Sequence, residues 1–482
     1  MPSVSQVATA LQQILEDEAR TLAKETGCIQ RERALTGADL AQTLIFGWLQ
    51  EPDLSLCGLS QVAGRREVSI SASGLCQRFS QQSAAFLQAL LGRLVQVQLA
   101  WDQAQSQVVL PLLSRFAAVI VEDSTSIHLP SQLSEVWSGR NNPAALLKLF
   151  VRLNLSTGAL AGPLLTPGRQ SDSHSPFDEQ SLPAGSLYVA DLGFFCVDRL
   201  QRLAHPAEGD KRFFMMRYKH GTRLQTRGGH RLELAGVLPQ QPGACRELGV
   251  LLGQQQRLPV RLIMLRVPEE VAEQRREQAR QQAHEHGREV SAESLYLAQW
   301  TIVLTNVPRR LLSWQEALEV LGARWQIERL FRLWKHEGRL DKWNSQKPYR
   351  ILTEIYAKLA AQLIGQWLIS AGCWADPHRS LDKAAQVVRR ESNRIMVALW
   401  EGGLEGTLTS LLRCFGSGCQ VEKRTTFPST AQRLCGMAVG SAKRPSPPKG
   451  RRRGKVRYWP AGRGWAYAGQ RSRRKKQAPR LT

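Results

Sequence analysis

The chain has 482 residues, which is too many for one ordinary hydrophobic core, so we expect two or three domains. Hydrophobic residues make up 43%, enough for real burial, while 65 Lys and Arg against 41 Asp and Glu give a formal net charge of +24. This charge favours a polyanionic partner such as nucleic acid, although charge alone does not separate DNA from RNA or from an anionic membrane.

The cysteines and the start of the chain argue against a secreted or membrane protein. The nine cysteines form no CxxC pair and no Cys/His spacing suited to zinc. The N-terminus lacks a basic start followed by an apolar run, so we expect no signal peptide. No stretch approaches 18 uninterrupted apolar residues. We therefore expect a cytoplasmic location with reduced thiols.

Residues 1–112 have apolar side chains three and four positions apart, a spacing that predicts helices. Segment 59–64, followed by 68–71, is typical of a short helix, a Gly turn and the start of a second helix. This weak helix-turn-helix signal leads us to interpret 1–112 as a helical N-terminal DNA-binding domain. An ordinary helical packing domain fits the pattern equally well.

From residue 113 the pattern changes to short apolar runs of buried-strand length. One such run leads directly into Asp123, and another leads into Asp191. Two buried strands that each deliver an Asp at the carboxyl end are the arrangement that a metal site needs. We interpret 113–210 as the first part of a catalytic core, with strands predicted at 117–121, 146–155, 158–165 and 186–190.

Two other acids in this region are left out of the predicted site. Glu122 adjoins Asp123, but successive side chains of a strand point to opposite faces. Asp172 follows a Gly-containing stretch, and we expect it to be a loop carboxylate.

Residues 211–296 alternate short strand-like segments with a highly charged helix, and we interpret them as a β-rich insertion between core elements. A further strand is predicted at 300–306, so the second part of the core is placed at 297–345. Helices follow from Ser313, a residue type typical of N-caps. We interpret 346–440 as a C-terminal helical domain and a candidate for dimerisation.

The final segment, 441–482, carries fifteen Lys or Arg residues and no acid, together with aromatic residues that include Tyr458, Trp459 and Trp465. We predict a basic disordered tail that binds phosphate backbones without sequence preference. A merely solubilising tail is the alternative. The aromatic residues favour nucleic acid, because they can stack on bases.

The two strand-end acids suggest phosphodiester chemistry. Cleavage and joining need charge neutralised on both the attacking and the leaving oxygen, and two metal ions about 4 Å apart provide this when carboxylates bridge them. Asp123 and Asp191 fit two ligand positions, and a third acid is expected on a helix downstream. The best candidate is Glu328, in segment 324–335.

This segment has two faces when it is drawn as a helix. Arg324, Glu328 and Lys335 fall within about 40° of one another, while Phe331 and Trp334 lie on a neighbouring apolar face. One face would pack on the core, and the other would present an acid flanked by two cations. A helix that only faces solvent would show the same amphipathic pattern.

The helix closely resembles the Tyr-x2-Arg-x3-Glu-x6-Lys signature of DDE transposases in insertion-sequence family four. Arg324, Glu328 and Lys335 stand at the matching positions, and Leu321 stands where the family has Tyr. Three further motifs match in the same order. They are Asp123-Ser124-Thr125 for the first Asp, Asp191-Leu192-Gly193-Phe194-Phe195 for the second, and Leu304-Thr305-Asn306 for the strand before the Glu helix.

The resemblance implies an α/β fold with a ribonuclease-H-like catalytic core and a β-rich insertion, flanked by N-terminal and C-terminal helical regions. It implies a DNA transposase that catalyses metal-dependent cleavage and strand transfer at the ends of an insertion sequence. Its partners would be the double-stranded DNA of the transposon ends and of the target, and a second copy of the chain in a synaptic complex. The location implied is the bacterial nucleoid.

By the same likeness, Asp123, Asp191 and Glu328 are the catalytic residues and hold Mg²⁺, for which Mn²⁺ could substitute. They would position water or a 3′ hydroxyl for in-line attack, while Arg324 and Lys335 would bind DNA near the cleaved end. Leu321 lacks the hydroxyl that contacts the end phosphate in the family, which puts the DNA-positioning role of this position in doubt.

Two other functions stay open at this point. A stand-alone nuclease on the same core would cleave DNA but never join it. A catalytically silent DNA-binding regulator would bind DNA without needing the three acids, all of which are present here with their flanking motifs.

Overall fold

The computed structural model describes residues 2–421, apart from 33, 103–110, 140–143, 206–210, 286, 288, 375 and 377–378. The tail predicted at 441–482 lies outside the described residues, as does the end of the C-terminal region from 422 onward. No helix in the described part of the chain is both long and apolar enough to cross a membrane.

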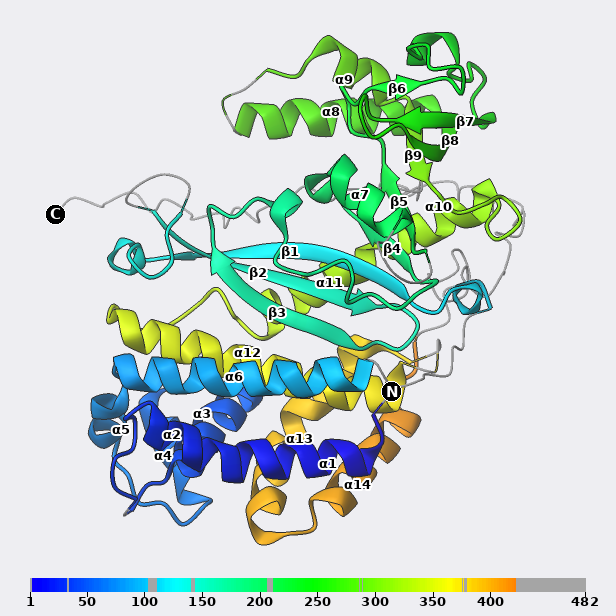
Figure 1. Cartoon of the computed structure of the whole chain (residues 1–482). Coiled ribbons are helices and arrows are strands. Elements are labelled where there is room, and N and C mark those ends of the chain that lie inside the picture. Colours follow the sequence, from blue (N-terminus) through cyan, green and yellow to red (C-terminus); the bar gives the residue numbers. More distant parts are fainter. Residues whose placement is uncertain are drawn as a thin grey trace, which may run out of the picture.

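The described residues form a mixed α/β structure (Figure 1). Its α-helices are α1 (Val4–Gln12), α2 (Ala19–Glu25), α3 (Gly37–Gln50), α4 (Leu56–Gly64), α5 (Ala72–Arg78), α6 (Gln81–Asp102), α7 (Val197–Ala204), α8 (Glu269–Glu285), α9 (Ala292–Leu297), α10 (Trp314–Ala323), α11 (Trp325–Arg332), α12 (Pro348–Cys373), α13 (Leu381–Glu401) and α14 (Leu404–Gly418). Its strands are β1 (Val119–Leu129), β2 (Ala145–Asn154), β3 (Leu160–Pro167), β4 (Leu187–Ala190), β5 (Phe213–Arg217), β6 (Leu224–Gln225), β7 (Cys245–Leu252), β8 (Leu258–Arg266) and β9 (Trp300–Thr305).

The strands form one sheet in the order β3-β2-β1-β4-β5-β9-β8-β7-β6. β1, β2 and β3 are antiparallel neighbours, whereas β4 is parallel to β1 and β5 is parallel to β4. The remaining pairs are antiparallel. Alternation along β1 gives the sheet two apolar faces, because Val119 and Val121 join one hydrophobic core and Ala118 and Ile120 join another.

A layer of helices covers one face of the sheet. Figure 1 shows α6 and α12 beneath β1–β3, with the other N-terminal and C-terminal helices beyond them. α12 packs against α6 and α3, and α13 packs against α3 and α14. The regions expected as separate N-terminal and C-terminal helical flanks therefore share one core, which also includes the β1 side chains Val119 and Val121.

The segment with the helix-turn-helix signal folds as two short helices, α4 and α5, each with a Ser N-cap. Arg66, between them, is buried and forms ion pairs with Asp39 at 2.9 Å and Glu16 at 3.3 Å. These pairs fix the turn against the neighbouring helices. DNA binding by residues 1–112 stays a prediction.

The segment expected as an insertion continues the same sheet. β8 pairs with β7 and β9, and β9 pairs with β5. β5 falls inside the range 211–296, yet it lies next to β4. In Figure 1, β6–β8 and the helices α8 and α9 stand at the end of the molecule away from α1–α6.

Candidate active site

The first two predicted acids are neighbours across two parallel strands. Glu122 on β1 lies opposite Ala190 on β4, so the next residues, Asp123 and Asp191, meet at one edge of the pairing. β4 ends there, whereas β1 continues to Leu129 and stays paired with β2. The prediction that the first strand ends at its acid was therefore wrong, because β2 still completes one side of β1.

The third acid reaches the same edge from a helix. α11 packs on β1, and its buried side chains Ile327 and Phe331 join the core beneath the sheet. This packing leaves the Glu328 side chain partly exposed beside the strand ends. The three acids, predicted from separate elements, are thus brought to one place.

Arg324 lies among the three carboxylates. Its Nη2 donates a hydrogen bond to Glu328 Oε1 at 2.6 Å and lies 3.9 Å from Asp191 Oδ1, while its Nη1 is 3.7 Å from Asp123 Oδ2. The residue sits at the junction between α10 and α11 and is 9% exposed. The side chain predicted to face DNA therefore faces the acids in this structure.

Burial and the neighbouring charges shift the pKa values of the groups at this site. Burial raises the pKa of Asp123 to about 7, although the Arg324 guanidinium and the Ser124 backbone N–H oppose the rise. For Arg324, burial lowers the pKa, but the three carboxylates outweigh it, so its pKa lies above the ordinary value. The guanidinium is therefore charged at every physiological pH.

A second cation, Arg217, was not predicted. Val189 on β4 lies opposite Met215 on β5, so Arg217 stands in register with Asp191 and on the same face. Burial lowers its pKa and so does Arg324, while Asp191 and Glu328 counteract this effect. The only signal in the sequence is an Arg at the end of an apolar run, the same signal that marks the two Asp residues.

Lys335 lies further along the same helical segment, in a π-helical turn, η7 (Leu333–Glu337). Its Nζ donates a hydrogen bond to the Ser126 carbonyl oxygen at 2.8 Å, which links η7 to β1. Burial lowers the pKa of this amine, and Asp341 opposes the shift.

Leu321, at the position where the family has Tyr, is buried in the apolar core.

The acids left out of the predicted site have other partners. Glu122 is fully buried on the opposite face of β1, as expected. Asp172 lies, as expected, in the loop between β3 and β4, where it begins a short 3-10 turn, η4 (Asp172–His174). It accepts a hydrogen bond from Ser124 Oγ at 2.6 Å and pairs with Lys148 at 2.7 Å. Asp172 therefore holds its loop against the residue that follows Asp123.

The donor set fits a hard divalent cation, because all three side chains are carboxylates and a positive charge already stands within 3.9 Å of each. As they stand, no three His, Cys, Asp or Glu side chains among the described residues lie close enough together to hold a metal ion. The Arg324 nitrogens lie 2.6 to 3.9 Å from the carboxylate oxygens, farther than the 2.0–2.1 Å of the bonds typical of Mg²⁺.

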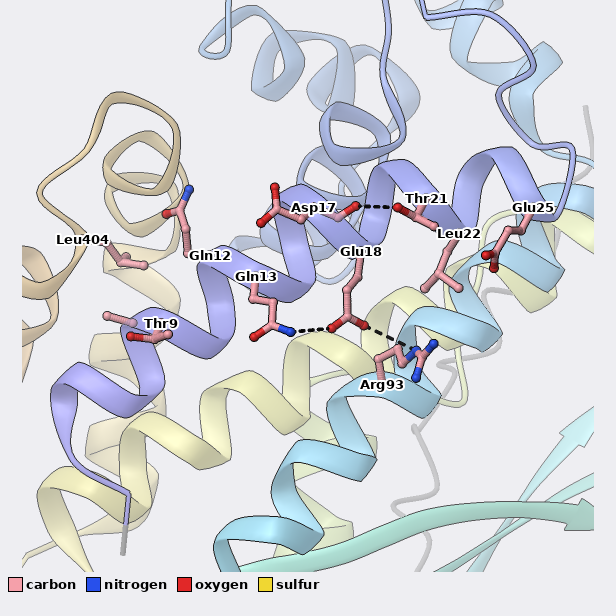
Figure 2. Close-up of a pocket in the computed structure, with 11 residues that line it drawn as sticks. Thr9, Gln12, Gln13, Asp17, Glu18, Thr21, Leu22, Glu25, Arg93 and Leu404 are labelled. Atoms are coloured by element: carbon pink, nitrogen blue, oxygen red, sulfur yellow. Dashed lines mark hydrogen bonds and ion pairs between the residues drawn. The ribbon is translucent and has the colours of Figure 1, made fainter.

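A large cavity lies elsewhere, among the helices. It has a volume of about 790 Å³ and is lined mainly by α1, α2 and η1 (Gln13–Glu18), with Arg93 and Leu404 at its sides (Figure 2). Three acids face it, but Glu18 is paired with Arg93 at 3.4 Å. None of the predicted site residues lines this cavity, so its size does not identify the catalytic centre.

Comparison with known proteins finds a family that matches this part of the chain. Residues 114–364 match the family described as Transposase DDE domain, a range that includes all three acids. The chain is 27% identical over 362 residues to the transposase for insertion sequence element IS231C of Bacillus thuringiensis subsp. berliner, covering 71% of this chain and 75% of that protein.

A second relative is the transposase for insertion sequence element IS1151 of Clostridium perfringens, 22% identical over 73% of this chain and 78% of that protein. Among solved structures, the piggyBac transposase synaptic complex with hairpin DNA aligns with a TM-score of 0.45 at 8% identity, over 89% of this chain and 84% of that chain.

Proposed function

The chain belongs to the transposase DDE domain family, and from this premise we propose that Asp123, Asp191 and Glu328 hold two Mg²⁺ ions for DNA cleavage and strand transfer at the ends of an insertion sequence. The chain is a DNA transposase, and membership of the family implies a requirement for divalent metal. The observation that carries the proposal is the convergence of the three carboxylates on one cation.

The sheet supports a ribonuclease-H-like core as part of this proposal. Its half made of β3-β2-β1-β4-β5 has three antiparallel strands followed by two parallel ones, and the acids lie where β4 ends. We propose core parts at 113–210 and 297–345, an insertion at 211–296 whose first strand, β5, continues the core sheet, and helical domains at 1–112 and 346–440. The first helical domain would bind DNA.

Each acid has a defined part in the proposed chemistry. Bound metal ions would neutralise charge on the attacking and leaving oxygens of the scissile phosphate. Asp123 is fixed by the sheet and Glu328 by α11, whereas Asp191 directly follows the last residue of β4, so each of the three ligands lies in or next to a regular element. The cations Arg324 and Lys335 would bind DNA phosphates beside the cleaved bond.

A strand-transfer assay tests the proposal. The substrates would be the inverted repeats that flank the coding region in the source DNA, together with a target duplex and Mg²⁺ or Mn²⁺. We expect cleaved ends and joined products, both lost when EDTA is added. Cleavage without joining would indicate a stand-alone nuclease, and DNA binding without cleavage would indicate a silent regulator.

We propose a homodimer in the synaptic complex, in which each chain acts at one of the two transposon ends. Light scattering of the complex with end DNA should give a mass of two chains and two DNA ends.

For the tail at 441–482, we propose binding to phosphate backbones. Truncation after Ser441 should flatten the salt dependence of DNA binding, because fewer counterions would be released.

A further inference from the structure

The Arg324 side chain lies between the three acids that are proposed to hold metal. One carboxylate oxygen from each of Asp123, Asp191 and Glu328 lies within 3.9 Å of its guanidinium. Without a cation between them, three carboxylates close to the end of β4 would repel one another. The guanidinium therefore stabilises the acids in the absence of metal.

The guanidinium and the metal ions compete for the same oxygens. A carboxylate bound to Mg²⁺ gives an oxygen to a bond of about 2.0–2.1 Å. Glu328 Oε1 already accepts the 2.6 Å hydrogen bond of Arg324, and a nearby guanidinium would repel the metal. Metal binding thus requires Arg324 to give up its contacts with the acids.

The Arg324 side chain is also less firmly anchored than the two buried arginines that pair with Glu122. Arg152 and Arg199 pair with Glu122 and have further partners, which include the Asp178 carbonyl oxygen for Arg152 and Glu179 for Arg199. Among the described residues, the ion pairs of the Arg324 side chain all go to the three acids.

We propose that Arg324 is an internal counter-cation that holds the metal-free site together and is displaced when the metal ions bind. This inference rests on the proposed function, since it needs the three acids to be the metal ligands. In this proposal Arg324 competes with the metal ions for the acids. This competition sets the metal concentration at which the site fills.

The test is a Mn²⁺ titration of the full-length chain, followed by calorimetry and by the electron paramagnetic resonance of free Mn²⁺, with thermal unfolding measured in parallel. Arg324→Gln should bind Mn²⁺ at least about tenfold more tightly than the original chain, equivalent to about 1.4 kcal/mol. Without metal the variant should melt at a lower temperature, and Mn²⁺ should reduce that difference.

Two control variants separate competition from a general effect of charge. Arg217→Gln removes a neighbouring buried cation that lies on the same face, and it should change Mn²⁺ affinity much less than Arg324→Gln. Arg324→Lys keeps a positive charge and should keep weak Mn²⁺ binding. Equal gains for Arg217→Gln and Arg324→Gln would overturn the inference, because they would show that any nearby cation has the same effect.

The remaining outcomes distinguish this inference from the proposed metal site. Unchanged or weaker Mn²⁺ binding in Arg324→Gln would overturn the inference, provided that Asp123→Asn abolishes Mn²⁺ binding by the otherwise unaltered chain. Absence of any Asp123-dependent Mn²⁺ binding, in both the original chain and Arg324→Gln, would overturn the metal assignment and the inference together.

Discussion

Glu122 and Asp123 are consecutive in the chain, yet they belong to charged clusters on opposite faces of β1. Glu122 has no exposed side-chain surface and is paired with Arg152 at 2.7 Å and Arg199 at 3.0 Å. Asp123 keeps 18% of its side chain exposed, and its arginine contact is 3.7 Å long. The two clusters use the same residue types in different surroundings.

The difference lies in how completely each carboxylate is satisfied. Glu122 is held by two arginines that have further partners of their own. Its negative charge is therefore fully neutralised and does not attract a ligand. Asp123 shares one arginine with two other acids, so negative charge exceeds positive charge in these contacts. An acid–arginine cluster indicates function when it is accessible and under-neutralised, rather than simply because it exists.

The largest expected effect is on catalysis. Asp123→Ala, Asp191→Ala and Glu328→Ala should each abolish DNA cleavage, because each removes a proposed metal ligand. Binding to end DNA should stay largely intact, and a gel-shift assay beside the cleavage assay checks both. Full cleavage by any one of the three variants would remove that residue from the site.

On the other face, the largest expected effect is on stability. Glu122→Ala leaves two buried arginines without their shared carboxylate and should lower the free energy of unfolding by about 3–5 kcal/mol. Denaturant unfolding followed by circular dichroism measures the change. Asp123→Ala is the matched variant, one residue away, and should be much less destabilising because it relieves repulsion among the acids. Equal destabilisation by both variants would refute the contrast between the two faces.

The sequence predicted the two Asp positions because an apolar run followed by an acid marks where a buried strand meets solvent. It did not predict that β1 continues past Asp123. The residues there are polar because β4 has already ended, and pairing with β2 alone keeps them extended. A local pattern of polarity cannot show which neighbouring strand is missing.

The roles of the cations were harder to predict. Helical periodicity places Arg324, Glu328 and Lys335 on one face of the helix, but it does not show which of them contacts the two Asp residues. Arg217 joins the site only through the register of β4 and β5, which depends on tertiary structure. The shared core of the N-terminal and C-terminal helices likewise comes from packing between α6 and α12, far apart in the sequence.

A smaller effect is expected for Lys335, which combines a link to β1 with a proposed DNA contact. Lys335→Ala should weaken binding to end DNA about tenfold, equivalent to about 1.4 kcal/mol, and slow cleavage, while Mn²⁺ affinity stays nearly unchanged. Lys335→Met keeps the apolar stem, so similar losses in both variants would assign the effect to the charge. A large change in metal requirement with normal DNA binding would refute the DNA-binding role.

The smallest expected effect concerns a third kind of acid–arginine pair, at the surface. Glu316 closes the capping box of α10 with Ser313 and pairs with Arg115 at 2.8 Å, where both side chains are about a third exposed. The hydrogen bond from Arg115 lowers the pKa of Glu316 to about 2, assisted by the Ser313 hydrogen bonds. Since this pKa is lower in the folded state, the pair stabilises the fold above about pH 4.5 and loses that effect as the pH falls towards 2.

Glu316→Gln isolates this ion pair, because Gln can still complete the capping box while its charge is gone. The variant should lose roughly 0.2–1 kcal/mol of stability at pH 7, the range found for exposed ion pairs. This difference from the original chain should shrink between pH 4.5 and pH 3, because Glu316 takes up a proton in the unfolded state there while it stays largely ionised in the folded state. Denaturant midpoints measured across pH 3–7 follow it. A difference that stays constant down to pH 3 would show that the Gln side chain disturbs the helix start, so that the loss does not come from the charge.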